Sequence, residues 1–147
     1  MPGLPIVPEG PRPLREPERD SSRPDLREED LEPLLTRFYA TVERDELLAP
    51  YFAAIDMREH IPRIADFWST IIFHSGRYAG NAFRPHLEMP GLTAEHFVHW
   101  LAVLERTVDA SHAGPNAEMM KALGHRVAYS MQLRLGITPA FAYRELP

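Results

Sequence analysis

Apolar residues recur at intervals of three and four along most of the chain, which is the spacing of one face of an α-helix. The pattern appears in four stretches, at residues 31–42, 60–72, 97–108 and 120–135. No stretch alternates between apolar and polar residues for long enough to form a strand. The pattern therefore predicts an all-α protein with four main helices and several shorter ones.

Residues that start and stop helices stand at the ends of these stretches. Asp30, Asp56 and Thr93 each come before a stretch and can accept hydrogen bonds from its first backbone amides. Gly136 follows the last stretch and is typical of a helix C-terminus. Pro62 lies about one turn inside the second predicted helix, so we expect a kink or an irregular start there.

Residues 1–24 differ from the rest of the chain in composition. They hold seven of the fifteen prolines, separated largely by charged residues, and such a segment has too little apolar area to form a core. We predict an extended or disordered arm, and a flexible terminus is a simpler interpretation than an interaction tail. Residues 25–147 then form one domain, which is long enough to bury a single core.

The composition is that of an ordinary soluble globular protein, with 44% hydrophobic and 25% charged residues. A net charge of −5 gives no basic surface for nucleic acid. No apolar run reaches the roughly 18 residues that a membrane span needs, and no secretory signal pattern opens the chain, so a cytoplasmic location is expected. The absence of cysteine excludes disulfides, iron–sulfur clusters, thiolate-bound haem and covalently attached haem.

Aromatic and histidine side chains stand at wide intervals across the helical part of the chain. They are Tyr39, Phe52, His60, Phe67, Trp68, His86 and Trp100. His60 and His86 fall on different predicted helical segments, and a buried imidazole is costly unless its nitrogens find partners. Two such histidines flanked by aromatic rings indicate a planar cofactor with a metal at its centre. One histidine would bind the metal while the other guards the opposite face.

The residues around the two histidines fit this interpretation. His60, Ile64 and Trp68 recur every four residues, so they share one helix face and form an apolar wall with a polar group at its edge. Arg63 lies beside that edge, where it could meet a carboxylate such as a haem propionate. His86 lies in a stretch rich in proline and glycine, from which it can aim a nitrogen without distorting a long helix.

Other histidines offer rival sites. His96 and His99 form an H-x-x-H pair that could bind zinc, but no third or fourth ligand stands at a suitable position. His74, His112 and His125 are expected in loops or on the surface. The Glu-x-x-His pairs that a ferritin-like di-iron site needs do not occur in the sequence.

Four segments of the chain resemble the truncated haemoglobins, and group III most. They read RFYATVERDELLAPYF, EHIPRIADFWS, RYAGNAFRPHLEMPG and EHFVHWLAVLERTV. The intervals agree as well, with 13 residues from Tyr39 to Phe52, 18 from Trp68 to His86 and 14 from His86 to Trp100. Groups I and II usually carry Gly-Gly pairs around the distal helix, and this chain has no such pair, which favours group III.

The resemblance covers roughly residues 30–135 and implies a two-over-two helical sandwich around a b-type haem. It implies that His86 is the proximal iron ligand and that Phe52 packs against the porphyrin. The distal residues that it implies are Tyr39, His60 and Trp100. The full set predicted to bind the cofactor is Phe52, Arg63, Ile64, Trp68, Arg84 and His86.

The predicted function is reversible binding of O2 at a haem iron, with NO and CO as related ligands. A haem redox enzyme, either an NO dioxygenase or a peroxidase-like protein, is an alternative, because a donor that stabilises bound O2 also polarises it for reaction. Such an enzyme would need an electron-donating reductase as its partner. A third interpretation is a helical interaction module without haem. No nucleic-acid or membrane partner is expected.

Overall fold

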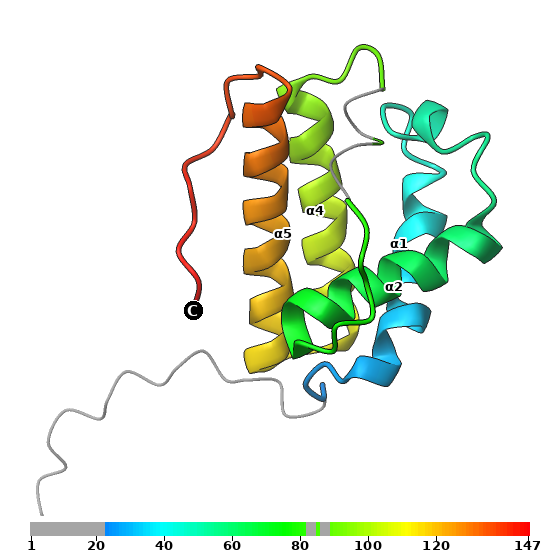
Figure 1. Cartoon of the computed structure of the whole chain (residues 1–147), viewed down its shortest axis with the longest axis vertical. Helices are drawn as coiled ribbons and strands as arrows, with labels where there is room; N and C mark the ends of the chain where they lie inside the picture. The colour runs from blue at the N-terminus through cyan, green and yellow to red at the C-terminus, as the bar shows by residue number, and fades with distance from the viewer. Residues whose placement is uncertain (1–22, 82–84, 86–88) are drawn as a thin grey trace, which may run out of the picture.

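The computed structural model of the chain describes residues 23–81, 85 and 89–147 (Figure 1). These residues form two short 3₁₀ helices, four main α-helices and no strand, so the all-α prediction is confirmed. None of the helices in this described part of the chain is long and apolar enough to cross a membrane. In chain order the elements are η1 (Glu28–Asp30), α1 (Leu31–Val42), η2 (Ala49–Tyr51), α2 (Met57–Phe73), α4 (Ala94–Ser111) and α5 (Pro115–Arg134).

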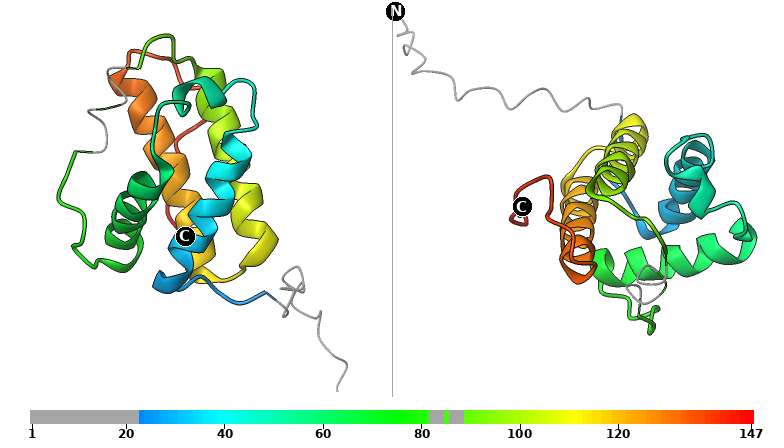
Figure 2. Two further views of the ribbon diagram at one scale, coloured as in Figure 1. Left: turned by 90° about the vertical axis from the view of Figure 1, so that its right-hand side faces the viewer. Right: turned by 90° about the horizontal axis from the view of Figure 1, so that it is seen from above.

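The four main helices form two pairs. α4 packs on α5, and α1 packs on α2. Across the pairs, α1 contacts α4 and α2 contacts α5. Figure 2 shows α4 and α5 side by side, with α1 and α2 on the other side of the core. This arrangement is the two-over-two helical sandwich that the resemblance implies.

Local capping explains where two of the helices begin. Asp56 accepts a hydrogen bond of 3.0 Å from the amide of Arg58 and starts α2 as predicted. Asp30 stands at the N-cap of α1. Its carboxylate, however, accepts a hydrogen bond of 2.9 Å from the amide of Arg27 and so caps the start of η1. The prediction that the Asp30 side chain caps the long helix is therefore wrong. α2 runs through Pro62 without interruption.

The start of α5 is capped by a residue that is distant in the sequence. The carboxylate of Asp25 accepts hydrogen bonds from the amides of Asn116 and Ala117, at 3.1 and 3.0 Å. Gly114, just before the helix, has a φ of +145°, and a Cβ there would lie 2.5 Å from Cγ of Asp25. This approach therefore requires glycine, and an N-cap of this kind contributes about 0.5–2 kcal/mol of stability.

Most of the predicted arm lies outside the described residues, which begin at Arg23. The last two residues of the arm are attached to the helical body. The Arg23 guanidinium donates to the carbonyl of Asp109, and the carbonyl of Pro24 accepts a hydrogen bond of 2.9 Å from the amide of Ala113. The chain therefore enters the body beside the turn that joins α4 to α5.

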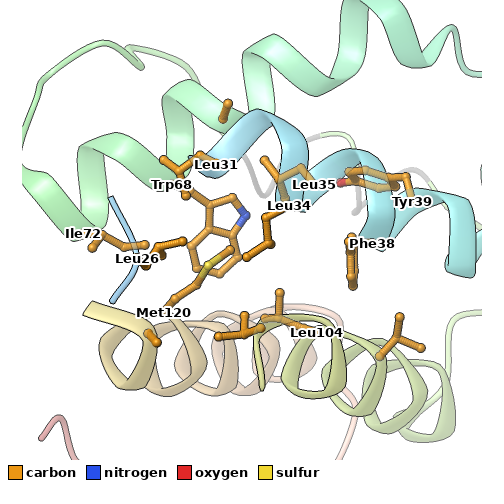
Figure 3. Packing of buried hydrophobic residues seen from close by; sticks show 14 of the residues in the cluster. Leu26, Leu31, Leu34, Leu35, Phe38, Tyr39, Trp68, Ile72, Leu104 and Met120 are labelled. Atoms are coloured by element: carbon orange, nitrogen blue, oxygen red, sulfur yellow. The ribbon is translucent and has the colours of Figure 1, made fainter. Parts of the chain in front are cut away.

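The main core lies between the two pairs of helices, and all four contribute large side chains to it (Figure 3). Among them are Leu34 and Phe38 of α1, Trp68 of α2, Leu104 of α4 and Met120 of α5, none more than 2% exposed. Full burial of one such side chain contributes about 1.5–3 kcal/mol. α5 comes close to α4 at Gly124, where a Cβ would lie 2.4 Å from Cδ2 of Leu104.

His112, predicted in a loop or on the surface, lies in the loop after α4 but is only 7% exposed. It directly follows α4, and its Nε2 lies 3.3 Å from Oδ2 of Asp30. Its Nδ1 lies 2.8 Å from Oγ of Ser111. Both ring nitrogens thus have partners, which is what makes a buried imidazole tolerable. The cluster joins the end of α4 to the start of α1.

The segment after α5 runs back along that helix (Figure 1). Its apolar residues Ile137 and Phe141 join a second cluster that contains Phe97 of α4 and Met131 of α5. His125, predicted in a loop or on the surface, is half-buried on α5, and its ring lies 4.4 Å from that of Phe141 between centroids. The tail therefore covers part of the outer face of α5.

Candidate cofactor pocket

A cavity of about 330 Å³ lies among α1, η2, α2, α4 and α5. Its walls are mostly aromatic and aliphatic. The apolar lining includes Phe38, Leu48, Ile55, Phe67, Phe97, Leu104 and Met131. A concave apolar site with a few converging polar groups is the usual form of a cofactor pocket.

Seven of the nine residues predicted for the site line this single cavity. They are Tyr39, Phe52, His60, Arg63, Ile64, Trp68 and Trp100. The remaining two, Arg84 and His86, lie outside the described residues. The structure thus brings together residues that are up to about 60 positions apart in the sequence, while the chemical role of each stays a prediction.

Three side chains that can form hydrogen bonds reach the cavity from three helices: Tyr39 from α1, His60 from α2 and Trp100 from α4. The ring of Tyr39 stands edge-on to that of His60, with 5.3 Å between centroids. Phe38 packs edge-on against both Tyr39, at 5.0 Å, and Trp100, at 5.9 Å. Edge-to-face packing of this kind is favourable and directional, so it holds the three polar groups in fixed orientations.

Tyr39 is the most deeply buried of the three, with 6% of its surface exposed. Burial raises the pKa of its phenol well above the usual value of 10, because a phenolate would lose its hydration there. Tyr39 therefore keeps its proton at physiological pH. It can act as a hydrogen-bond donor to a ligand in the cavity.

Because the pKa of Tyr39 is raised, we expect the folded protein to lose stability at alkaline pH, and part of this loss should come from the Tyr39 phenol. Below pH 10 the phenol is protonated in both the folded and the unfolded chain; above pH 10 only the unfolded chain ionises, which favours unfolding. Between about pH 9 and about pH 11, the free energy of unfolding should fall by about 1.4 kcal/mol less in Tyr39→Phe than in the wild type. Urea titrations at the two pH values measure this difference.

The matched control is Tyr143→Phe, which makes the same chemical change at a residue that is 49% exposed. This variant should show the same alkaline loss as the wild type. Equal losses in Tyr39→Phe and the wild type would show that the Tyr39 phenol is not held in its protonated form.

The turn that carries Phe52 to the cavity is fixed by Asp45. Its Oδ1 accepts hydrogen bonds from the amides of Leu47 and Leu48, at 2.9 and 3.1 Å. Its Oδ2 lies 3.2 Å from Nδ1 of His99. Partial burial by itself would raise the pKa of Asp45, but the hydrogen bonds from His99 and the two amides outweigh it and lower the pKa. The ionised carboxylate thus supports the turn at neutral pH.

Both histidines of the H-x-x-H pair are engaged within the fold. His99 pairs with Asp45, and Nδ1 of His96 accepts a hydrogen bond of 3.0 Å from the amide of Thr93. Within the part of the chain that the structure describes, no three His, Cys, Asp or Glu side chains gather as a metal site. The pair therefore contributes to helix capping and loop attachment.

Several lining residues are missing from the sequence prediction, among them Phe38, Tyr51 and Tyr78. Phe38 belongs to the apolar stripe of α1, and helical spacing alone cannot distinguish a core position from a cavity position. Tyr51 precedes Phe52 in the chain, and this neighbour was the one sign in the sequence that could have indicated it.

A second hollow, of about 500 Å³, lies beside η1, α1 and α2. It is lined by acidic side chains, among them Glu28, Glu32 and Asp66. Arg77 also lines it and already pairs with Glu28 over 2.9 Å. Because this hollow has no aromatic ring and none of the predicted site residues, the apolar cavity is the candidate site.

The residues of the apolar cavity fit a haem in their chemistry. Aromatic and aliphatic walls suit the faces of a porphyrin, and Tyr39, His60 and Trp100 place polar groups within these walls. Arg63 lines the cavity while remaining exposed, so its guanidinium can pair with a carboxylate that projects toward solvent. With no cysteine in the chain, attachment would be non-covalent.

The helical sandwich has the fold of a truncated globin. The crystal structure of group III truncated hemoglobin from Campylobacter jejuni matches it with a TM-score of 0.68 and 24% sequence identity, over 82% of this chain and 95% of that one. Group 3 truncated hemoglobin ctb from Campylobacter jejuni is 27% identical over 107 residues, which are 69% of this chain and 82% of that protein. No protein-family model matches the chain. The resemblance to the truncated haemoglobins, and to group III among them, is confirmed.

Proposed function

We propose that the chain binds a b-type haem through His86 and holds O2, with NO and CO as related ligands, beside Tyr39, His60 and Trp100. The observation that carries this proposal is the meeting of these three side chains, from three helices, in one apolar cavity. The relative from Campylobacter jejuni supports it, because that protein is named a hemoglobin. When bound, haem would supply an iron that can bind a diatomic ligand.

Different residues of the chain would hold the iron, pair with the haem carboxylates and pack against the porphyrin. His86 would hold the metal with a neutral imidazole nitrogen, and Arg63 would pair with a haem carboxylate. Phe52 and Ile64 would pack against the cofactor and keep water away from it. Arg84 would be a further cofactor contact, in line with the sequence prediction.

The polar side chains of the cavity would act on the gas ligand. The phenol of Tyr39 and the indole N–H of Trp100 are hydrogen-bond donors, and a bound, partly negative O2 is an acceptor. Tyr39 is kept protonated by its burial, so this donor does not depend on pH in the physiological range. His60, edge-on to Tyr39, would add a third polar contact or control entry to the cavity.

Tryptophan fluorescence tests whether haem enters this cavity. The chain has two tryptophans, Trp68 and Trp100, and both line the cavity. Titration with haem should therefore quench most of the emission and saturate near one haem per chain, and Trp100→Phe should retain the quenching of Trp68. Free N-acetyltryptophanamide corrects for light absorbed by haem in solution. Emission that falls no further than in this control would contradict haem binding at the proposed position.

A further inference from the structure

A contact between two loops lies in the wall of the cavity. Tyr51, the last residue of η2, donates a hydrogen bond of 2.7 Å from its hydroxyl to the carbonyl of Pro90. The two residues are 39 positions apart in the sequence. Tyr51 lines the cavity, and so do Met89 and Leu92 on either side of the Pro90 turn. The hydrogen bond thus joins two parts of the cavity wall.

Both partners of this contact are held in place by further interactions. The ring of Tyr51 packs edge-on against His96, with 5.3 Å between centroids. Nδ1 of His96 is itself fixed by the amide of Thr93 at 3.0 Å and lies 2.9 Å from the Thr93 hydroxyl. Gly91 has a φ of +77°, and a Cβ there would lie 3.5 Å from the Tyr51 hydroxyl. The positive φ of Gly91 is a conformation that glycine adopts readily, and it shapes the turn at Pro90.

The position of the contact links it to the proposed cofactor. Tyr51 directly precedes Phe52, which is predicted to pack against the haem, and Pro90 follows the predicted iron ligand His86 by four residues. We propose that Tyr51 is a positioning residue for the cofactor: its hydroxyl ties the wall that carries Phe52 to the turn at Pro90, and so slows escape of the haem. This inference rests on the proposed function.

The hydroxyl is the part of Tyr51 that a conservative variant can isolate. In Tyr51→Phe the ring still packs against His96, while the hydrogen bond to Pro90 is lost. A net hydrogen bond contributes on the order of 1 kcal/mol, so the barrier to separating the two loops should fall by a similar amount. We therefore expect haem to leave Tyr51→Phe about fivefold to tenfold faster than the wild type.

The experiment compares Tyr51→Phe with Tyr143→Phe, the same change at an exposed tyrosine that does not line the cavity. Haem loss is followed by transfer from the oxidised, haem-loaded protein to an excess of apomyoglobin. Loss should be faster in Tyr51→Phe and unchanged in Tyr143→Phe. The melting temperature of the haem-free protein should fall by only a few degrees in Tyr51→Phe, because this variant loses one hydrogen bond worth about 1 kcal/mol, so both variants stay folded during the assay.

Hydrogen–deuterium exchange of the haem-free protein gives a readout that does not depend on haem. Peptides covering residues 49–52 and 89–93 should exchange faster in Tyr51→Phe than in Tyr143→Phe, because the contact between the two loops is broken. Equal haem loss in the two variants would overturn the inference, and so would equal exchange. If no variant binds haem, the proposed function fails, while the exchange result still decides whether the loop contact exists.

Discussion

His86→Ala is expected to lose nearly all ability to retain haem. The chain has no cysteine to attach the cofactor, so we expect a histidine to hold the iron, and His86 is the residue that both its isolated position and the resemblance assign to that role. Even outer partners of metal ligands are worth about 10–100-fold in affinity, so loss of the ligand itself should cost at least that much. Haem content after reconstitution and gel filtration measures the effect.

His99→Ala is the control for this experiment. His99 does not line the cavity and pairs with Asp45 on the loop side of α4. Its variant should keep the haem content of the wild type. Equal haem content in the wild type and His86→Ala would contradict the assignment of His86 as the iron ligand. The remaining candidates for the ligand would then be His60 and His96, which line the cavity.

Slow release of O2 is the second large effect that we expect. Tyr39 and Trp100 both reach the cavity and both carry a donor hydrogen. A net hydrogen bond contributes on the order of 1 kcal/mol, and about 1.4 kcal/mol is tenfold in an equilibrium constant, so two independent donors would slow release by roughly 25–100-fold relative to an apolar cavity. Tyr39→Phe and Trp100→Phe should each accelerate release about fivefold to tenfold.

Stopped-flow measurement of O2 release from the two variants and their combination tests this expectation. The effects should not add, because both donors act on the same small ligand. Tyr129→Phe, at a tyrosine outside the cavity, should release O2 at the rate of the wild type. Fast release in the wild type, unchanged in both cavity variants, would reject the donor pair and favour a simple carrier. Slow release with rapid reaction of the O2-loaded protein with NO would favour the redox alternative.

The helices could be predicted from the sequence because their determinants are local. Apolar spacing and capping residues within one turn of each boundary place α2 and α4 correctly, and Asp56 caps α2 as predicted. The cap of α5 could not be predicted in this way, since Asp25 lies about 90 residues before the amides that it binds. The burial of His112 could not be predicted for the same reason: its partner Asp30 belongs to another helix.

Part of the candidate site could also be predicted, but from residues far apart in the sequence and not from local signals. Ring-bearing residues at long intervals indicate a shared pocket even when no single pair is informative, and the structure brings Tyr39, His60 and Trp100 to one cavity. Contacts made only by the tertiary fold were missed. The bond from Tyr51 to Pro90 depends on how two loops meet, and nothing near either residue in the sequence indicates it.

The absorption spectrum of the full chain, mixed with equimolar haem and freed of excess by gel filtration, tests haem binding most directly. An intense, narrow band at about 400–430 nm is expected, because haem held by a histidine in an apolar cavity is isolated from other haem molecules. The band should move when the protein is reduced and exposed to CO, and it should be absent from His86→Ala. A broad, weak absorption like that of free haem, in a protein that is folded by circular dichroism, would contradict the proposal that this chain is a haem protein.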